Sequence, residues 1–263
     1  MQAGIKNKDR SVMNIQWGKK KYADDFNFVP QYGEAVLDLI TLPKGSFAVD
    51  LGCGNGALTA KLAERGYDVL GIDDSAEMLE LAVQQHPDIA FRKDNALTFR
   101  LNQPADIIFS NAVFHWINAE NQQLMLNNIA ANIRTGGELV TEFGGYGNGA
   151  AVHTTLARKF ADRGLDYAFE FYFPTIGVYA PMLETAGLRV EYAVLFDRPT
   201  PQKSKDGLAD WIRMFNMRPF EAIDSDLTEE IIREAAADLC PVLYHDGHWF
   251  IDYVRIRIRA RKI

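Results

Sequence analysis

Cysteine is scarce in this chain. Cys53 and Cys240 are the two cysteines among 263 residues, which excludes a disulfide framework as the source of stability and a metal cluster built from thiols. No apolar run approaches the roughly 20 residues of a membrane-spanning helix, and the first ten residues have no apolar segment of the kind that a signal peptide requires. We therefore expect a cytoplasmic protein without stable membrane association.

Positive charge is also in short supply. Lys and Arg number 28 against 35 Asp and Glu, a formal net charge of −7, which argues against a nucleic-acid partner because phosphate recognition needs clustered cations. In the basic stretch at residues 255–261, arginines alternate with Ile256, Ile258 and Ala260. This period of two predicts a final strand with one buried face and with arginines that are solvated or snorkel to solvent.

The histidines invite a metal hypothesis, but their spacing does not support it. His245 and His248 flank Asp246 and Gly247, which look like a turn before the last strand. A pair of ligands three residues apart across such a turn is a poor start for a metal site, so we expect no bound metal ion.

The most informative stretch is residues 47–56, which place a buried strand, an acid at its carboxyl end and a glycine turn in succession. Asp50 precedes three alternate glycines, Gly52, Gly54 and Gly56, with Cys53 and Asn55 between them. Glycines allow the main chain to approach a ligand closely. Residues 57–65 read as a helix stopped by a glycine, so the turn directs a helix N-terminus at that ligand.

Two classes of ligand fit this turn. Gly52, Gly54 and Ala57 satisfy a loose dinucleotide fingerprint, which keeps an NAD-dependent oxidoreductase as an alternative. Asp50 would repel a pyrophosphate but suits a cationic ligand without phosphate. At this point the chain resembles the class I S-adenosylmethionine-dependent methyltransferases, whose motif has the form acid-x-Gly-x-Gly-x-Gly. Another alkyl transfer, such as lipid cyclopropanation, is a minor alternative.

Polar residues follow the next strands in the order that this resemblance implies. Asp73 and Asp74 end an apolar strand about twenty residues after the first glycine, where a ribose-binding acid belongs. The resemblance places Asp94 and Asn95, after the third strand, against the adenine amino group. The cofactor-binding residues that we expect are Asp50, Gly52, Cys53, Gly54, Asn55, Gly56, Asp73, Asp74, Met78, Asp94, Asn95 and Asn111.

The phrase at residues 109–116, Phe-Ser-Asn-Ala-Val-Phe-His-Trp, resembles the small-molecule carboxyl methyltransferases related to trans-aconitate and malonyl-carrier-protein methyltransferases. Methyl transfer from a sulfonium needs no acid, and a carboxylate acceptor needs no base, whereas a phenol, amine or alcohol would benefit from one. His115 is the candidate base. The alternative is a pocket-wall residue that hydrogen bonds or packs beside Trp116.

Alternating strands and helices predict an α/β fold: a Rossmann-like, doubly wound, mostly parallel sheet. With the resemblance, the expected sheet has seven strands, an antiparallel last strand and helical lid insertions. A helix from Asn118 should end near Gly136 and Gly137. We expect one domain, 1–263, with a core at about 43–145, 175–197 and 248–261, an N-terminal cap at 11–42, and lids at 146–174 and 198–247.

The acceptor is not named by any motif. Aromatic residues that could line its pocket are Tyr22, Trp116, Tyr146, Tyr172 and Trp211. Arginines that could hold an acid group are Arg198, Arg213 and Arg218. The sequence thus predicts a methyltransferase that acts on a small molecule, with oxygen of a carboxylate or hydroxyl as the candidate acceptor. The oligomeric state stays open.

Overall fold

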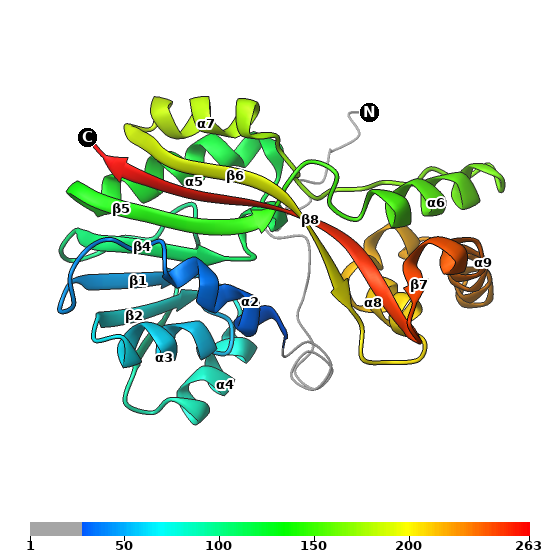
Figure 1. Ribbon diagram of the computed structural model, residues 1–263, viewed down its shortest axis with the longest axis horizontal. Helices are drawn as coiled ribbons and strands as arrows, with labels where there is room; N and C mark the ends of the chain where they lie inside the picture. Colours follow the sequence, from blue (N-terminus) through cyan, green and yellow to red (C-terminus); the bar gives the residue numbers. More distant parts are fainter. Residues whose placement is uncertain (1–27) are drawn as a thin grey trace, which may run out of the picture.

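The computed structural model describes residues 28–263, with side chains from Gly33 onward, so Tyr22 and most of the expected N-terminal cap lie outside the described residues. These residues form an eight-stranded sheet (Figure 1). Its main path runs β3 (Ala90–Lys93), β2 (Asp68–Asp73), β1 (Phe47–Leu51), β4 (Ala105–Asn111), β5 (Ile133–Gly144), β8 (His248–Lys262) and β6 (Leu188–Pro201).

Strand direction in this sheet follows the prediction. Strands β1 to β5 pair in parallel, whereas β8 is inserted antiparallel between β5 and β6. The additional strand is β7 (Tyr244–His245), which forms a hairpin with β8. Asp246 and Gly247 have φ of 51° and 78° in this hairpin, which confirms the expected turn. The Rossmann-like fold is therefore confirmed.

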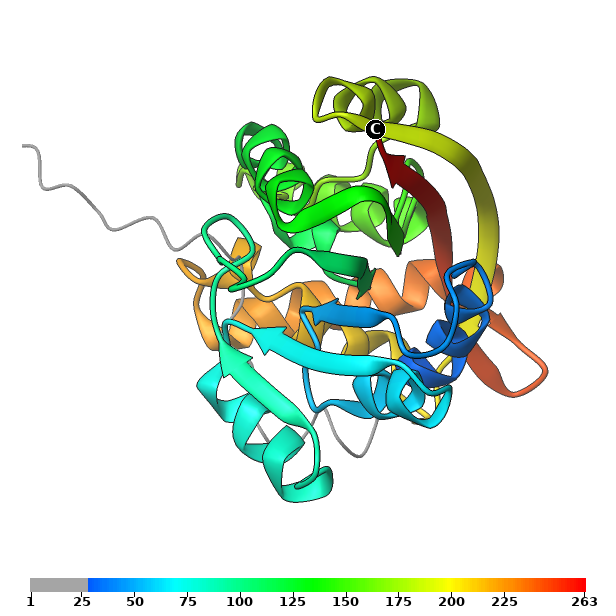
Figure 2. The same ribbon diagram turned by 90° about the vertical axis from the view of Figure 1, so that its left-hand side faces the viewer.

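Helices cover both faces of the sheet (Figure 2). Apolar residues of α2 (Phe28–Leu37) and α3 (Ala57–Glu64) pack on one face. The other face is covered by α5 (Ala119–Asn132) and α7 (Ile176–Thr185). Helix α4 (Ala76–Gln85) begins at the predicted cap, where Ser75 Oγ accepts a hydrogen bond from the Met78 amide at 3.3 Å.

One predicted boundary is wrong. Helix α5 ends at Asn132, and Gly136 and Gly137 lie inside β5 rather than at the end of the helix. Ile133 already pairs with Ala105 of β4, and the ladder contains an irregularity just after that pair. A Cβ on Gly137 would lie 2.7 Å from the carbonyl oxygen of Asp106. Gly137 therefore permits close strand pairing, and Gly136 has a positive φ of 77°; sequence pattern alone did not distinguish either role from a helix stop.

A second core lies beyond the carboxyl edge of the sheet. It is built from α6 (Ala150–Ala161), α8 (Gly207–Phe215) and α9 (Ser225–Leu243), together with the first part of β8. We call these three helices the helical insertion; they lie beside the sheet in Figure 1. The expected movement of this insertion as a lid stays a prediction.

Strand β8 joins the two cores. Its 15 residues span roughly 50 Å at about 3.3 Å per residue. Trp249, Ile251 and Tyr253 pack in the core of the helical insertion, whereas Ile256 and Ile258 pack in the core of the sheet. The odd-numbered face therefore changes from apolar residues to arginines at residue 255, at the junction of the two cores.

The arginines of β8 are not solvated, contrary to the expectation from their spacing. Arg257 pairs with Glu142 at 2.6 Å, and Arg261 pairs with Glu138 at 2.7 Å. The side chains of Glu142 and Glu138 are 3% and 0% exposed. The antiparallel insertion of β8 places its arginines opposite acids of β5, and this neighbour could not be read from the tail alone.

The ion pair at Glu142 gives a stability prediction. Glu142 binds both Arg198 and Arg257, so E142Q should leave two largely buried guanidinium groups without a carboxylate. We expect a loss of about 3 kcal/mol in the free energy of unfolding, measured as a lower urea midpoint. The control E64Q removes the surface pair with Lys61, in which Glu64 is 64% exposed, and should cost less than about 0.5 kcal/mol. Equal losses would contradict the proposed importance of burial.

Candidate functional site

A cavity of about 1210 Å³, counted to its open mouth, lies between the carboxyl ends of β1 to β4 and the helical insertion. We call the part along the strand ends the sheet half; its lining residues are Leu51, Gly52, Gly54, Ile72, Asp73, Asp74, Met78, Asp94, Asn95, Ala96, Asn111, Ala112 and Val113. We call the remainder the aromatic half; its lining residues are His115, Trp116, Ile117, Asn148, His153, Phe171, Phe173, Trp211, Phe215, Tyr253 and Arg255.

Two glycines of the turn, Gly52 and Gly54, have different surroundings. Gly52 and Gly54 both have positive φ, 79° and 55°. A Cβ on Gly52 would lie 2.2 Å from Val113, so this position is closed by packing. At Gly54 the nearest atom is Met78 Cε at 3.4 Å, and the residue lines the cavity. Both glycines line the cavity, and Gly54 is the one at which an added Cβ would enter open space rather than a packed side chain.

Acidic and amide groups from two strand ends meet in the sheet half, as the motif order predicted. Asp73 accepts hydrogen bonds from the amides of Gly54 and Ser75, each at 2.8 Å, and burial raises its pKa. Asn95 donates to Asp74 at 3.1 Å. Each carboxylate oxygen of Asp73 keeps a free lone pair, so Asp73 can still accept hydrogen bonds from a ligand.

Asp50 does not line the cavity. Its side chain is 2% exposed, accepts a hydrogen bond from Thr59 Oγ1 of α3 at 2.7 Å, and has its pKa raised to about 7 by burial. Side chains alternate along β1, so Leu51 reaches the cavity while Asp50 faces α3. Asp50 therefore does not reach the cavity to contact a cationic ligand, as we expected. Its side chain instead joins β1 to α3 through the hydrogen bond with Thr59.

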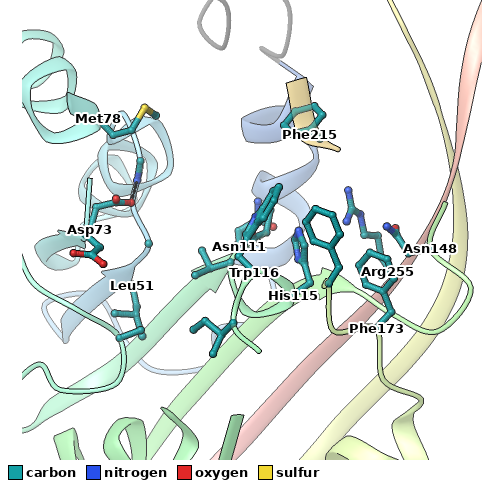
Figure 3. Close-up of a pocket in the computed structure, with 18 of the residues that line it drawn as sticks. Leu51, Asp73, Met78, Asn111, His115, Trp116, Asn148, Phe173, Phe215 and Arg255 are labelled. Atoms are coloured by element: carbon teal, nitrogen blue, oxygen red, sulfur yellow. Dashed lines mark hydrogen bonds between the residues drawn. The ribbon is translucent and has the colours of Figure 1, made fainter. Parts of the chain in front are cut away.

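Three other residues expected at the cofactor also lie outside the cavity lining. Cys53 is buried beneath the turn. Asn55 Oδ1 accepts a hydrogen bond from the Ala57 amide at 3.3 Å, at the start of α3. A Cβ on Gly56 would lie 2.6 Å from Phe91. These residues shape the turn from behind, whereas Met78 and Asn111 line the cavity as expected (Figure 3).

His115 is held in one tautomer. Its Nδ1 accepts a hydrogen bond from the Gly144 amide at 3.2 Å, so the proton of the neutral ring lies on Nε2. Burial, with a contribution from the charge of Arg255, lowers the pKa of His115 well below its ordinary value. The ring packs beside Trp116, with centroids 5.1 Å apart. This geometry favours the alternative to a base: a wall residue that donates a hydrogen bond.

A second histidine, His153 of α6, is oriented by a short relay. Asn216 donates to the Tyr167 hydroxyl at 2.7 Å, and that hydroxyl lies 2.8 Å from His153 Nδ1. The phenol hydrogen has no other acceptor in the described structure, so it is donated to Nδ1 and leaves the His153 proton on Nε2. Burial lowers the pKa of His153 to about 4. Sequence reasoning missed this residue because its partners come from different segments.

Arg255 lies at the opposite end of the cavity from Asp73 and Met78 (Figure 3). Its guanidinium carbon sits 4.2 Å from the centre of the Tyr253 ring, and Tyr253 accepts a hydrogen bond from Trp211 Nε1. Among the described side chains, no carboxylate lies within 4 Å of the Arg255 guanidinium. Arg255 therefore presents an unpaired cation to the cavity, a role that the sequence reading did not assign to it.

Asn148 completes this end of the cavity and lies next to Arg255 in Figure 3. Its Oδ1 accepts a hydrogen bond from the Val254 amide at 3.1 Å, so the side-chain NH₂ remains as a donor. His115, His153 and Asn148 have each used their acceptor atom within the protein. Together with Arg255 they offer donors to a ligand, an arrangement that suits an anionic oxygen.

Of the other aromatic residues expected to line the substrate pocket, two do so and two do not. Trp116 and Trp211 line the cavity. Tyr146 does not: it is 67% exposed on the loop after β5. Tyr172 points away, with its hydroxyl 3.6 Å from Met182 Sδ of α7. The neighbours on either side of Tyr172, Phe171 and Phe173, line the cavity instead.

The arginines expected to hold an acid group are engaged elsewhere. Arg198 pairs with Glu142, Arg213 with Glu229 and Arg218 with Glu170. None of the three lines the cavity. Each lies on a strand or helix that turns it toward a neighbouring acid, and the sequence could not show this pairing.

Residues 28–263 contain neither a metal-binding cluster nor a membrane-spanning helix. No three His, Cys, Asp or Glu side chains gather there in a way that could hold a metal ion. His245 and His248 instead approach the carbonyl oxygens of Val242 and Asp246 at 2.6 and 3.0 Å. No described helix has the length and apolar character needed to cross a bilayer.

The sheet order and the site define the class of protein. A parallel Rossmann-like sheet with β8 inserted antiparallel beside β5, a glycine turn after β1, and acids after β2 and β3 at one cavity form the methyltransferase version of this fold. A family model described as a methyltransferase domain matches residues 48–137.

Relatives establish the family. The chain is 31% identical over 258 residues to an uncharacterised methyltransferase of Schizosaccharomyces pombe, covering 94% of this chain and 98% of that one. It is 27% identical to a trans-aconitate 2-methyltransferase of Agrobacterium fabrum, covering 94% of this chain and all of the other. The chain therefore belongs to the class I S-adenosylmethionine-dependent methyltransferases.

Solved structures agree on the fold. A Bacillus halodurans protein and an S-adenosylmethionine-dependent methyltransferase of Mesorhizobium loti superpose with TM-scores of 0.63 and 0.53, at 16% and 17% identity. They cover 88% and 87% of this chain and 99% and 96% of their own. The chain's membership of the S-adenosylmethionine-dependent family, rather than these structures, identifies S-adenosylmethionine as the cofactor and decides against the NAD-dependent alternative.

The glycine turn gives a binding prediction. G54A places a methyl group at the cavity surface, where backbone must approach the cofactor, and should weaken S-adenosylhomocysteine binding at least about tenfold. The positive φ should cost about 1 kcal/mol of stability. G164A is the matched control, because Gly164 also has positive φ, 67°, with open space around it. Calorimetry showing equal affinity in both variants would contradict the assignment.

Proposed function

We propose that this enzyme methylates a carboxylate oxygen of a small organic acid. The observation that carries the proposal is Arg255, a cation that faces the aromatic half of the cavity without a described carboxylate partner. An arginine can bind a carboxylate through two parallel hydrogen bonds. Arg255 is partly buried, and leaving such a cation without a counter-ion is costly, so an anionic ligand suits this end of the cavity.

The sheet half fits S-adenosylmethionine, which when bound supplies a methyl group on a cationic sulfonium. Asp73 retains lone pairs for the ribose hydroxyls, and Asp94 and Asn95 are the groups for the adenine amino group. The open backbone at Gly54 accommodates close approach. Met78 adds an apolar wall that can pack against a purine. The cofactor roles of these residues are part of the proposal.

The state of the histidines favours a carboxylate over a hydroxyl acceptor. A hydroxyl group benefits from a base that removes its proton during methyl transfer, whereas a carboxylate is already a nucleophile. His115 Nδ1 is occupied by the Gly144 amide, which leaves the ring with an N–H donor for the cavity. In this proposal His115 and His153 orient the carboxylate and do not accept a proton. The Agrobacterium relative, described as a trans-aconitate 2-methyltransferase, is in keeping with an acid substrate.

A matched set of acceptors tests the reaction. Release of S-adenosylhomocysteine should be measured with 3-phenylpropanoate, 3-phenylpropanol and 3-phenylpropylamine, which share a carbon skeleton and differ in the acceptor group. We expect turnover of the acid and not of the other two. Turnover confined to the alcohol or the amine would contradict carboxylate methylation while leaving the cofactor assignment intact.

Arg255 should govern use of the acid. R255Q removes the cation, and truncating one partner of a charged pair that the bound acid shields from solvent costs about 2–4 kcal/mol. We expect kcat/KM for 3-phenylpropanoate to fall roughly 30- to 1,000-fold, with S-adenosylhomocysteine affinity nearly unchanged. The control R213Q alters an arginine that pairs with Glu229 on the surface and should leave kcat/KM as it is. Equal effects of the two variants would remove Arg255 from the site.

His115 can be tested as donor against base. Gln places an amide N–H near the position of Nε2, so H115Q should retain most of the activity, whereas H115F should lose roughly 10- to 100-fold as a charged hydrogen bond is lost. A base would not be replaced by an amide. If H115Q is as impaired as H115F and activity follows a single ionisation near neutral pH, a proton-accepting role for His115 is supported instead.

A further inference from the structure

The aromatic half has a continuous wall of rings. Trp116 and Phe171 meet edge to face with centroids 4.6 Å apart. Phe171 and Phe173 lie parallel at 5.8 Å, and Phe215 of α8 lies 5.9 Å from Trp211. All five line the cavity with Arg255. Aromatic surfaces of this kind favour a flat or apolar partner over a hydrated one.

The indole N–H groups of this wall form hydrogen bonds within the protein. The Trp116 indole N–H donates to the Ala112 carbonyl at 3.0 Å, and the Trp211 indole N–H donates to the Tyr253 hydroxyl. The polar atoms of both tryptophans are therefore used inside the protein. What these rings present to a substrate is carbon surface, which rewards burial of apolar groups.

The charge of this half is small. Of the described residues that line it, Arg255 is charged, and His115 and His153 are neutral imidazoles near neutral pH because burial lowers the pKa of each. Asn148 adds a neutral donor. One carboxylate would be neutralised by Arg255. A second or third carboxylate on the same substrate would face aromatic rings without a cation, which is strongly unfavourable.

We propose that the acceptor is a monocarboxylic acid with an apolar, preferably aromatic, body. Its carboxylate meets Arg255 and the donors of His115, His153 and Asn148, and its body lies against Trp116, Phe171 and Phe173. This assignment rests on the proposed carboxylate methylation. It differs from the tricarboxylate in the name of the Agrobacterium relative, because the described residues of the aromatic half provide one cation and a wall of rings.

Substrate selectivity tests the charge count. Release of S-adenosylhomocysteine should be measured with octanoate, octanedioate, 3-phenylpropanoate and trans-aconitate, and binding of each acid to the S-adenosylhomocysteine complex should be measured by calorimetry. We expect kcat/KM for octanoate to exceed that for octanedioate at least about 30-fold, with trans-aconitate the poorest. Shortening the linear acid should lower kcat/KM about fourfold per methylene removed.

Variants test the ring wall. F171L and F173L should each lower kcat/KM for 3-phenylpropanoate about tenfold, with a smaller effect on octanoate, since a leucine keeps apolar contact but removes ring packing. Y172L is the matched control, because Tyr172 lies between Phe171 and Phe173 in the chain but has its hydroxyl on Met182. Its selectivity between the two acids should match that of the unaltered protein.

The outcomes separate the two proposals. Faster turnover of trans-aconitate or octanedioate than of the monocarboxylates would overturn the monocarboxylate assignment and leave carboxylate methylation standing. Turnover of alcohols or amines alone, or the absence of binding by every acid in both the unaltered protein and R255Q, would overturn carboxylate methylation itself. An equal change of selectivity in F171L, F173L and Y172L would contradict the proposed contact between the aromatic rings and the substrate.

Discussion

The antiparallel insertion of β8 between β5 and β6 is the constraint on which the site depends. Strand β8 extends beyond the carboxyl edge of the sheet. Its first half therefore packs into the helical insertion and its second half into the sheet. The period-two alternation of the strand then places Tyr253 and Arg255 on one face at the junction of the two cores. The guanidinium stacked on Tyr253 faces the cavity, while Arg257, two residues later, is bound by Glu142. One strand thus supplies both a structural ion pair and the cation of the site.

The cavity has an electrostatic division that matches the proposed reaction. Acids collect in the sheet half, where a cationic cofactor belongs, and hydrogen-bond donors collect in the aromatic half. In carboxylate methylation the charges of the sulfonium and the carboxylate are both lost as the methyl group moves. A buried, weakly polar site favours a reaction that removes charge. The neutral ester would also be held less tightly by Arg255, which assists its release.

Neutral histidines fit the same scheme. Hydrogen bonds from Gly144 and from the Tyr167 hydroxyl hold the Nδ1 atoms of His115 and His153. Each ring can then serve as a fixed donor without carrying a charge of its own. Burial under α6, α8 and the aromatic segment keeps both rings in this state. The helical insertion therefore contributes to the site by burying the two histidines as well as by supplying rings.

Much of the sheet half was predictable because its signals are local. The glycine turn, the acids that follow β2 and β3, and the Ser75 cap each depend on neighbours within a few residues, and parallel strands bring their carboxyl ends to one edge. Local pattern was less reliable where one sequence feature is compatible with two structures. Gly136 and Gly137 are compatible with a helix stop but lie in a strand. Asp50 matches the acid of the cofactor motif, yet its side chain faces α3.

The type of fold and the place of the cofactor site could thus be predicted from the sequence alone, because both are set by short-range patterns of glycine, acid and apolar spacing. The tertiary structure decided the substrate end. Whether an arginine is paired depends on acids far away in the chain: Arg198, Arg213 and Arg218 find partners, and Arg255 finds none among the described carboxylates. The rings that meet at the cavity likewise come from η1 (Phe114–Trp116), the 171–173 segment and α8. Contacts of this kind are fixed by how layers pack, which no local spacing encodes.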